Sequence, residues 1–315
     1  MKILITGGCG FKGSVLTNEL LKEGHKITIV DTQWFGNYLI KSKNIKIKKK
    51  DFRDLTLNEI EGHDAVIHLA NIANDPGVLL NPLLSWNVNV LGTQQLVEKI
   101  IKLKIKHFLF ASSGSVYGIN KNPKVTENLP LLPISVYNQT KMVAERTIMS
   151  YKNINTKIHI IRPATVCGLS PRMRLDVSVN LLTYQALKNK KITVLGGKQV
   201  RPNIHIKDMC RVYKHFLFNN KLPDGFYNAG FENISIIDIA KKIQSRIKCK
   251  IIIKPSNDPR SYRLDSSKLL KTGFKPAYSV DNAINEIILN FKKIDKNQKK
   301  SFTVKWMKKI GLSKN

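Results

Sequence analysis

The sequence has few acidic residues for its basic ones. Asp and Glu number 22 against 53 Lys and Arg, which gives a formal net charge of +31 at pH 7. Lysines account for 43 of the basic residues and are spread along the whole chain. Proteins that bind nucleic acids instead concentrate basic residues on one face and interleave arginine or aromatic groups. The charge therefore favours a solvated lysine surface and a small polyanionic ligand, with no nucleic-acid partner.

Cysteines and long apolar runs are also scarce. The four cysteines are far apart, without the paired spacing of a zinc site or a disulfide framework, so we expect a reducing compartment and no metal. The apolar run in "MKILITGG" is too short for a signal peptide, and no 18-residue apolar stretch follows. These absences predict a cytoplasmic protein with no membrane partner.

Short apolar runs alternate with helix-like segments as far as Arg162, as in a parallel sheet covered on both faces. We expect an α/β fold: a Rossmann-type doubly wound parallel sheet with a smaller, mostly C-terminal α/β substrate-binding domain. The runs predicted as strands are "KILITG", "KITIVD", "NIKIKKKD", "DAVIHLA", "HFLFASS" and "KIHIIRPA".

The pattern loosens after the sixth run. Helices are expected over 177–190, 235–247 and 279–293, and short strands in "ITVLGG" and "RPNIHI". The predicted division is a dinucleotide-binding domain with the catalytic groups over 1–165, a mainly substrate-binding domain over 166–295, and a loosely attached basic tail over 296–315.

A glycine-rich loop, "TGGCGFKG", follows the first predicted strand and opens a helix. Gly7, Gly10 and Gly13 have the spacing at which a tight turn lets a pyrophosphate approach a helix N-terminus. Lys12 stands where its charge opposes the dipole of a free helix start, so a bound anion explains it better.

Asp31 ends the second predicted strand, 18 residues after Gly13. A carboxylate there can accept hydrogen bonds from ribose hydroxyls and would repel the 2′-phosphate of NADP. No arginine follows in "DTQWFGN", so the sequence predicts NAD as the cofactor. The alternative is that Asp31 only starts a turn.

The segment "YNQTK" places Tyr137 and Lys141 one helical turn apart. An ammonium near a phenol lowers the phenol pKa and makes it a usable general base. Ser113, in "ASSGSVYG" after the fifth predicted strand, would lie beside Tyr137 at the edge where open α/β sheets bind ligands. We interpret Tyr117 as a wall of this pocket, because it has no lysine four residues later.

Together these motifs resemble the extended short-chain dehydrogenase/reductases of the NAD-dependent nucleotide-sugar epimerase and dehydratase family. The resemblance covers residues 1 to about 290 and is closest to a branch with nucleotide-heptose C4 dehydrogenases. The further segments that carry it are "DFRD", "HLAN", "NVLGT", "RPATVCG", "SPRMRLDVSVN", "RPNIHIKD" and "DPRSYRLDSSKL".

The resemblance implies roles for individual residues. Ser113, Tyr137 and Lys141 would form the catalytic triad. The cofactor would contact Gly7, Gly10, Phe11, Lys12, Gly13, Asp31, Asp51, Phe52, Leu69, Ala70, Asn89, Tyr137 and Lys141. The substrate would contact Ser113, Asn180, Arg201, Arg260 and Arg174, with Arg172 as a further candidate.

The resemblance implies an enzyme acting at C4 of a nucleotide-diphosphate sugar through a 4-keto intermediate, as a 4-epimerase or a 4-dehydrogenase in surface-polysaccharide sugar synthesis. Gly114 and Ser115 occupy the places where 4,6-dehydratases carry two carboxylates, which disfavours dehydration. A 4,6-dehydratase, a 4-ketoreductase and a non-catalytic NAD sensor or RNA-binding relative remain alternatives. The segments around "NVLGTQQLVEKIIKLK" and Tyr137 resemble the helix pair of the family's dimer interface, so a homodimer is expected.

Overall fold

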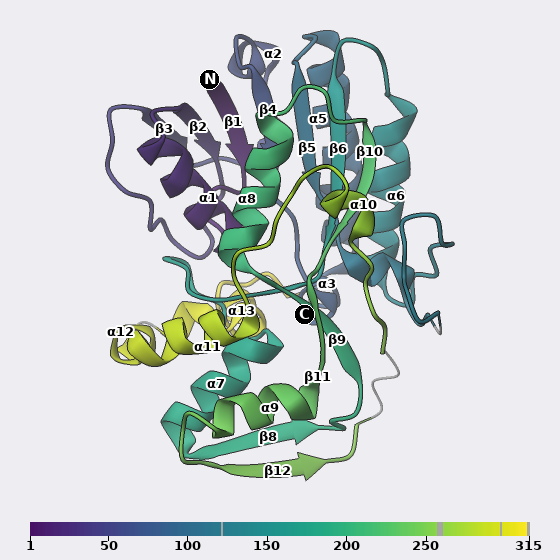
Figure 1. The fold of residues 1–315 in the computed structure, drawn as a ribbon. Helices are drawn as coiled ribbons and strands as arrows, with labels where there is room; N and C mark the ends of the chain where they lie inside the picture. The colour runs from purple at the N-terminus through teal and green to yellow at the C-terminus, as the bar shows by residue number, and fades with distance from the viewer. Residues whose placement is uncertain (121, 257–260, 297, 314–315) are drawn as a thin grey trace.

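The computed structural model describes residues 1–120, 122–256, 261–296 and 298–313. A parallel sheet of seven strands forms the larger part, in the order β10-β6-β5-β4-β1-β2-β3 (Figure 1). The strands are β1 (Lys2–Thr6), β2 (Lys26–Val30), β3 (Ile45–Lys48), β4 (Ala65–His68), β5 (His107–Ala111), β6 (Lys157–Pro163) and β10 (Gly225–Ala229). The six predicted strands are confirmed. The seventh was not predicted and returns to the sheet from the second half of the chain.

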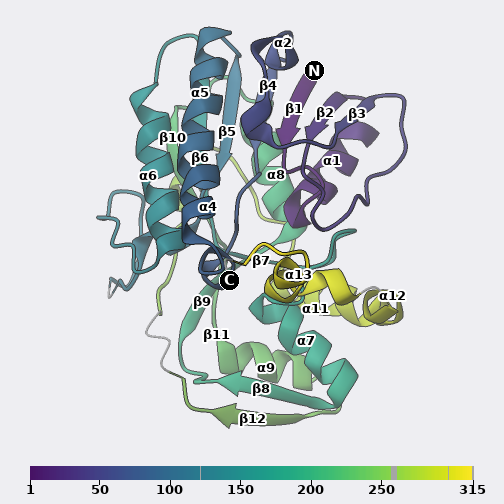
Figure 2. The same ribbon diagram turned by 180° about the vertical axis from the view of Figure 1, so that it is seen from behind.

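Helices cover both faces of this sheet and thereby bury its apolar strands on both sides. Ile3 and Ile5 of β1 face one apolar cluster, and Leu4 between them faces the other. The first cluster includes side chains of α1 (Phe11–Lys22) and α8 (Ile206–Leu217), and the second includes those of α5 (Thr93–Lys102) and α6 (Val136–Ser150) (Figures 1 and 2). The doubly wound fold is therefore confirmed.

Short helical turns fill the connections of the larger part. They are η1 (Phe52–Asp54), α2 (Leu57–Ile60), α3 (Asp75–Val78), α4 (Pro82–Trp86), the π-helical η2 (Asn87–Gly92), η3 (Gly114–Tyr117) and α10 (Ser267–Leu270).

The smaller part lies beyond the carboxyl ends of the central strands (Figure 1). One of its sheets has the order β11-β9-β7 and the other pairs β12 with β8 in parallel. Its elements are β7 (Thr165–Cys167), α7 (Ser178–Asn189), β8 (Lys191–Leu195), β9 (Val200–His205), β11 (Glu232–Ser235), α9 (Ile236–Gln244), β12 (Lys250–Lys254) and α11 (Val280–Leu289). The three helices predicted beyond residue 176 are present, although the third ends at Leu289 and is followed by a separate helix.

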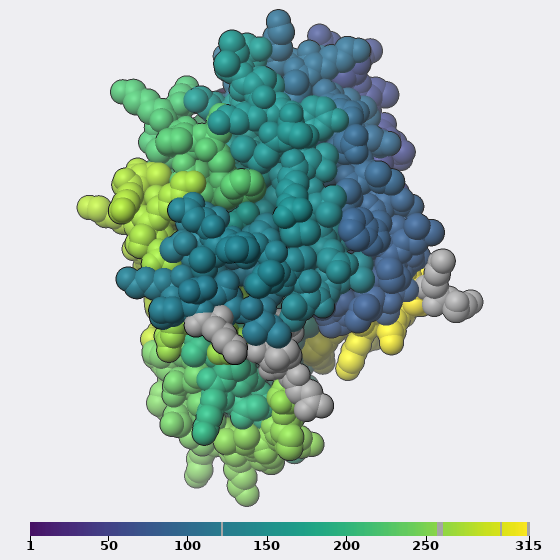
Figure 3. Space-filling model, turned by 90° about the vertical axis from the view of Figure 1, so that its right-hand side faces the viewer, coloured from purple at the N-terminus to yellow at the C-terminus, as the bar shows by residue number. Residues whose placement is uncertain are grey.

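The end of the chain differs from the loosely attached tail that we expected. It forms α12 (Phe291–Lys296), η4 (Gln298–Ser301) and α13 (Thr303–Lys309), and α13 returns to the junction of the two parts (Figures 1 and 2). Met307 is only 3% exposed and joins the apolar cluster that contains Ile72 and Val78. In Figure 3 this yellow segment lies against the underside of the blue portion of the larger part. Buried apolar residues among the lysines hold it there.

Within the described residues, no helix combines the length and apolar composition of a bilayer-spanning segment.

Candidate active site

The glycine-rich loop between β1 and α1 is too closely packed to hold side chains at two positions. Gly7 has φ +75°, and a Cβ atom there would lie 2.5 Å from the backbone nitrogen of Ala70. A Cβ atom at Gly13 would lie 2.3 Å from the carbonyl oxygen of Gly7. At the helix start, Gly10 provides no side-chain cap, so no side chain occupies the backbone N–H groups of the first turn. The loop therefore forms the cradle that a diphosphate needs.

Beside this cradle, one cavity of about 560 Å³ is lined by the cations Lys12, Lys141, Arg172 and Arg174. Burial, together with the charge of Arg174, lowers the pKa of Lys12 to about 8. The same two causes lower the pKa of Arg172 to about 9. Because these cations are partly desolvated and repel one another, a polyanion bound among them would be strongly favoured.

Asp31 lies at the other end of the loop, in an adjoining cavity of about 130 Å³. Its carboxylate accepts hydrogen bonds from the backbone nitrogens of Gln33 at 2.7 Å and Cys9 at 3.0 Å. Burial nevertheless raises the pKa of Asp31. Each carboxylate oxygen accepts only one of these bonds, so lone pairs remain for ribose hydroxyls.

The adjoining cavity also contains the residues predicted to meet the adenine end of the cofactor. Asp51, Phe52, Leu69 and Ala70 all line it. Burial raises the pKa of Asp51, but two hydrogen bonds from the Arg53 guanidinium outweigh this effect, and the net pKa is lowered. The rigid glycine cradle, the cations and this cavity fit the diphosphate and adenosine portions of NAD.

The structure brings the three proposed catalytic residues together at the edge of the larger cavity. Ser113 follows β5, and Tyr137 and Lys141 lie one turn apart near the start of α6. The Ser113 hydroxyl hydrogen-bonds the Tyr137 phenol. The Lys141 ammonium donates to the carbonyl oxygen of Ala111 at 2.5 Å, which fixes its position behind the sheet edge.

The expected drop in the pKa of Tyr137 is absent. Burial raises this pKa to about 12, although the hydrogen bond from Ser113 and the charge of Arg174 lower it in part. Burial and the charge of Lys12 also lower the pKa of Lys141 well below its usual value. The sequence gives the spacing of the phenol and ammonium, but desolvation depends on how the finished fold encloses them.

Tyr117 was expected in the pocket wall but lies in the core. It is fully buried, donates to Asn228 Oδ1 at 2.8 Å and accepts from Arg162 Nη1 at 2.8 Å. Arg162 also pairs with Glu145 on α6 at 2.7 Å, and Glu145 accepts a hydrogen bond from Ser112. This network fixes the end of β5 from behind, so Tyr117 supports the site without reaching it.

Two predicted contact residues also lie outside the cavities. Asn89 is fully buried and both accepts from and donates to the backbone of Ile72. Asn180 is fully buried and bonds the backbone of Gly168 and Arg174. Both amides therefore hold loops that line the site. An asparagine motif alone does not distinguish this role from ligand binding.

Arg174 and Arg201, expected to contact substrate, do line the larger cavity. Arg174 Nε donates to Asp176 Oδ1 at 2.9 Å, which orients its guanidinium. The prediction for Arg260 falls outside the described residues.

Several lining residues were not predicted. Asp75 at the start of α3 and Asp176 bring carboxylates to the cavity, and Thr303, Val304 and Met307 bring α13 to it. The buried residues of α13 are Thr303 and Met307, one turn apart among lysines, and this pair is too short a pattern to predict the helix from the sequence.

Comparisons with known proteins identify the family of this chain. Residues 3–230 match the "NAD dependent epimerase/dehydratase family". The chain is 30% identical to a UDP-glucose 4-epimerase of Lactobacillus helveticus, over 90% of this chain and 95% of that protein. It is 33% identical to the uncharacterized UDP-glucose epimerase YtcB of Bacillus subtilis, over 91% and 97%.

A solved UDP-glucuronic acid 4-epimerase from Bacillus cereus, in complex with UDP-glucuronic acid and NAD, has the same fold. Its TM-score is 0.83 at 27% identity, with 93% of this chain and all of that chain covered. The chain thus belongs to the NAD-dependent epimerase/dehydratase family, within the extended short-chain dehydrogenase/reductases. It is an enzyme of nucleotide-sugar chemistry, and its cofactor is NAD.

Proposed function

We propose that the enzyme oxidises C4 of a nucleotide-diphosphate sugar to a 4-keto intermediate, as a 4-epimerase or a 4-dehydrogenase. The observation that carries this proposal is the grouping of Ser113, Tyr137 and Lys141 in a cavity that is continuous with the glycine cradle. The 4-epimerase relatives in Lactobacillus helveticus and Bacillus cereus support it.

The side chains divide the work at the sugar hydroxyl. Ser113 hydrogen-bonds the reacting hydroxyl, and the Tyr137 phenolate removes its proton. Ser113 and the charge of Arg174 favour the phenolate, Lys141 contacts the cofactor, and Arg174 and Arg201 hold the anionic end of the substrate. Bound NAD supplies the hydride acceptor and the positive charge of its nicotinamide ring. Tyr137 returns the proton when the keto group is reduced again.

Dehydration across C5 and C6 is less well supported. At the two positions where dehydratases of the family carry carboxylates, this chain has Gly114 and Ser115, and neither side chain can act as an acid or a base there. Ser115 lines the cavity. Ser115 is hydrogen-bonded to Ser113 at 2.7 Å, so it supports the catalytic hydroxyl and cannot replace a general base at C5.

Incubation with a panel of UDP-, GDP-, CDP- and dTDP-linked sugars tests the reaction directly. Mass spectrometry and NMR would show unchanged mass with inverted C4 for an epimerase, and a loss of two mass units for a dehydrogenase. Loss of water would overturn the proposal in favour of dehydration. Tyr137→Phe is the matched inactive control.

We also propose that the enzyme is a homodimer that pairs through helices α5 and α6. The α5 and α6 helices pack against each other on one face of the sheet, and the neighbouring Leu83 and Leu91 are 59% and 51% exposed. Burying these side chains against a second copy would remove apolar surface from water. Light scattering at micromolar concentration should give twice the chain mass, and a monomer would contradict the interface. We place the enzyme in the cytoplasm, where it would supply sugars for surface polysaccharide.

A further inference from the structure

The C-terminal helix α13 closes one side of the cofactor cavity. Trp306 Nε1 donates to the carbonyl oxygen of Trp34 at 2.6 Å, in the segment after β2. The backbone nitrogen of Thr303 donates to Asp176 Oδ2 at 3.1 Å, in the segment after β7. Met307 is buried beside the segment after β4. The helix thus joins the three segments that border the cavity.

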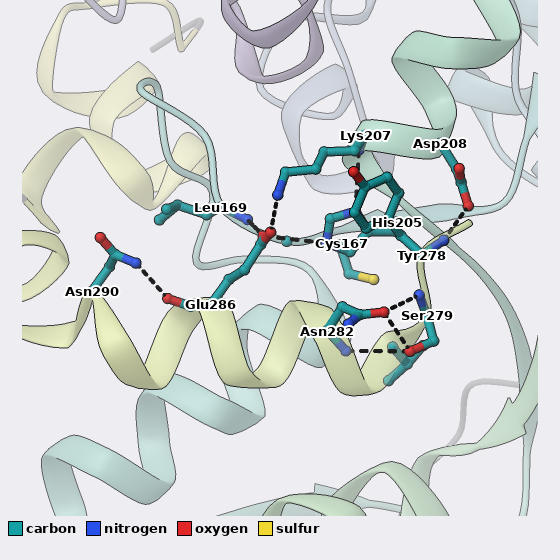
Figure 4. Close-up of polar contacts among 12 residues, drawn as sticks. Cys167, Leu169, His205, Lys207, Asp208, Tyr278, Ser279, Asn282, Glu286 and Asn290 are labelled. Carbon is teal, nitrogen blue, oxygen red and sulfur yellow. Dashed lines mark hydrogen bonds and ion pairs between the residues drawn. The ribbon is translucent and has the colours of Figure 1, made fainter. Parts of the chain in front are cut away.

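The segment after β7 is itself fixed against the glycine cradle. Ser170 Oγ donates to the carbonyl oxygen of Phe11 at 2.7 Å and contacts Ser14 Oγ at 3.0 Å, both on α1. On its other side, the backbone nitrogen of Leu169 donates to Glu286 of α11 at 3.2 Å (Figure 4). Arg172, two residues beyond Ser170, is therefore held close to the start of α1.

Arg172 is a buried cation with incomplete hydrogen bonding. Its side chain is 4% exposed, and its guanidinium stacks on the Phe35 ring at 3.9 Å from the centroid. Nη2 donates to Thr303 Oγ1 at 3.3 Å, but Nε has no hydrogen-bond partner. Among the described residues, no carboxylate forms an ion pair with Arg172. A buried guanidinium without an ion pair or a full set of acceptors is costly unless an anion binds to it.

The residues around Arg172 indicate which anion would bind to it. Phe35 lies in the segment after β2 and lines both the large cavity and the adenosine cavity, and the charge of Asp31 is close enough to affect the pKa of Arg172. Arg201 and Tyr262, by contrast, line the large cavity only. Arg172 therefore stands on the cofactor's side of the cavity, next to the glycine cradle.

We propose that Arg172, held by Phe35 and by Thr303 of α13, binds the diphosphate of NAD opposite the glycine cradle, together with Lys12. The C-terminal segment thereby becomes part of the cofactor site. An arginine can give two parallel hydrogen bonds to diphosphate oxygens, which a lysine cannot. Because α13 contacts all three bordering segments, it has to shift before the cofactor leaves, so release of NAD is slow.

Calorimetric titration of cofactor-stripped protein tests this proposal without any sugar present. Arg172→Gln should weaken binding of NAD and of ADP-ribose at least tenfold but leave adenosine affinity within twofold, because adenosine has no phosphate. The NAD affinity of Arg172→Lys should fall between that of the unaltered protein and that of Arg172→Gln. Arg246→Gln, on the exposed surface of the smaller part, is the matched control for loss of one positive charge and should bind NAD normally.

A second measurement addresses α13. Thr303→Val removes the hydroxyl that accepts from Arg172 and keeps the side-chain volume. Stopped-flow displacement of NAD, followed by tryptophan fluorescence, should show release several-fold faster than in the unaltered protein. An unchanged release rate would contradict the role of α13.

Three results would overturn the role of Arg172. An equal loss of adenosine affinity would mean that Arg172 only shapes the adenosine cavity. A loss of nucleotide-sugar affinity with normal NAD affinity would assign it to the substrate. A lower melting temperature with an unchanged NAD-induced shift would make it structural. None of these measurements depends on C4 chemistry, so their failure is distinguishable from failure of the proposed function.

Discussion

The Ser113 hydroxyl is hydrogen-bonded to the phenol of Tyr137 and lowers a phenol pKa that burial has raised. The two residues come from the end of β5 and the first turn of α6, 24 positions apart in the sequence. A hydrogen bond to the charged form of a base makes that form more accessible at neutral pH. Ser113 therefore acts on the proposed base as well as on the substrate hydroxyl in the proposed mechanism.

Tyr137→Phe removes the proposed base and leaves the ring volume unchanged. Turnover should fall by ~10²-fold or more, the typical contribution of a general base. NAD affinity should be nearly unchanged, because the glycine cradle and the cations do not depend on the phenol oxygen. Steady-state kinetics and calorimetry measure the two quantities. Turnover near that of the unaltered enzyme would rule out Tyr137 as the base.

The pH dependence of turnover follows from the raised pKa of Tyr137. Because the base must be deprotonated and its pKa in the free enzyme is about 12, kcat/KM should rise with pH through the neutral and mildly alkaline range. Ser113→Ala removes the hydrogen bond that favours the phenolate, so its profile should shift to higher pH. Ser150→Ala, at the far end of α6, serves as the control. A profile that does not move in Ser113→Ala would contradict the coupling.

Asp31→Asn should relax the preference for NAD over NADP. The amide oxygen can still accept a backbone N–H bond, so the segment is disturbed less than by alanine, but the negative charge that repels a 2′-phosphate is gone. We expect the ratio of the two dissociation constants to fall about tenfold, which corresponds to about 1.4 kcal/mol. Titration with both cofactors measures the ratio. An unchanged ratio would mean that Asp31 does not face the ribose.

The sequence predicted those parts of the site that depend on local spacing. The glycine loop, Asp31 and the Tyr137–Lys141 pair are each defined within one turn or one strand end, and the structure places all of them along the same cleft. Strand alternation likewise predicted six of the seven strands of the main sheet, since buried parallel strands are apolar throughout. The seventh, β10, has a less regular apolar pattern and comes from a distant segment.

Features that depend on contacts between distant segments could not be predicted from local sequence spacing. Tyr117 lies in the core because Arg162 and Asn228, 45 and 111 residues away, meet its hydroxyl. Asn180 has a residue type that suits both ligand binding and loop support, and only its contacts distinguish them. The many lysines around Trp306 made the segment look polar by composition, although one face of its helix is buried against the site.

Glu286 gives a prediction about stability that is separate from catalysis. Its carboxylate accepts from the backbone of Leu169 at 3.2 Å, from His205 Nε2 at 3.2 Å and from Lys207 at 2.5 Å (Figure 4). Burial raises its pKa, but the bonds from His205 and Lys207 outweigh this effect and lower it to about 2. An ionised Glu286 therefore stabilises the fold above the pKa of about 4.3 that a glutamate has in an unfolded chain.

Glu286→Gln should lower the free energy of unfolding at pH 7 by about 1–3 kcal/mol, as for a lost hydrogen-bonded charge. Since the folded pKa lies below the unfolded one, the difference from the unaltered protein should shrink as the pH falls from about 4 towards 2. Urea unfolding at pH 7, 5 and 3 measures it, with the exposed Glu61→Gln as control. A difference that stays constant over this range would show that the glutamate acts through packing, because only a titrating carboxylate makes it depend on pH.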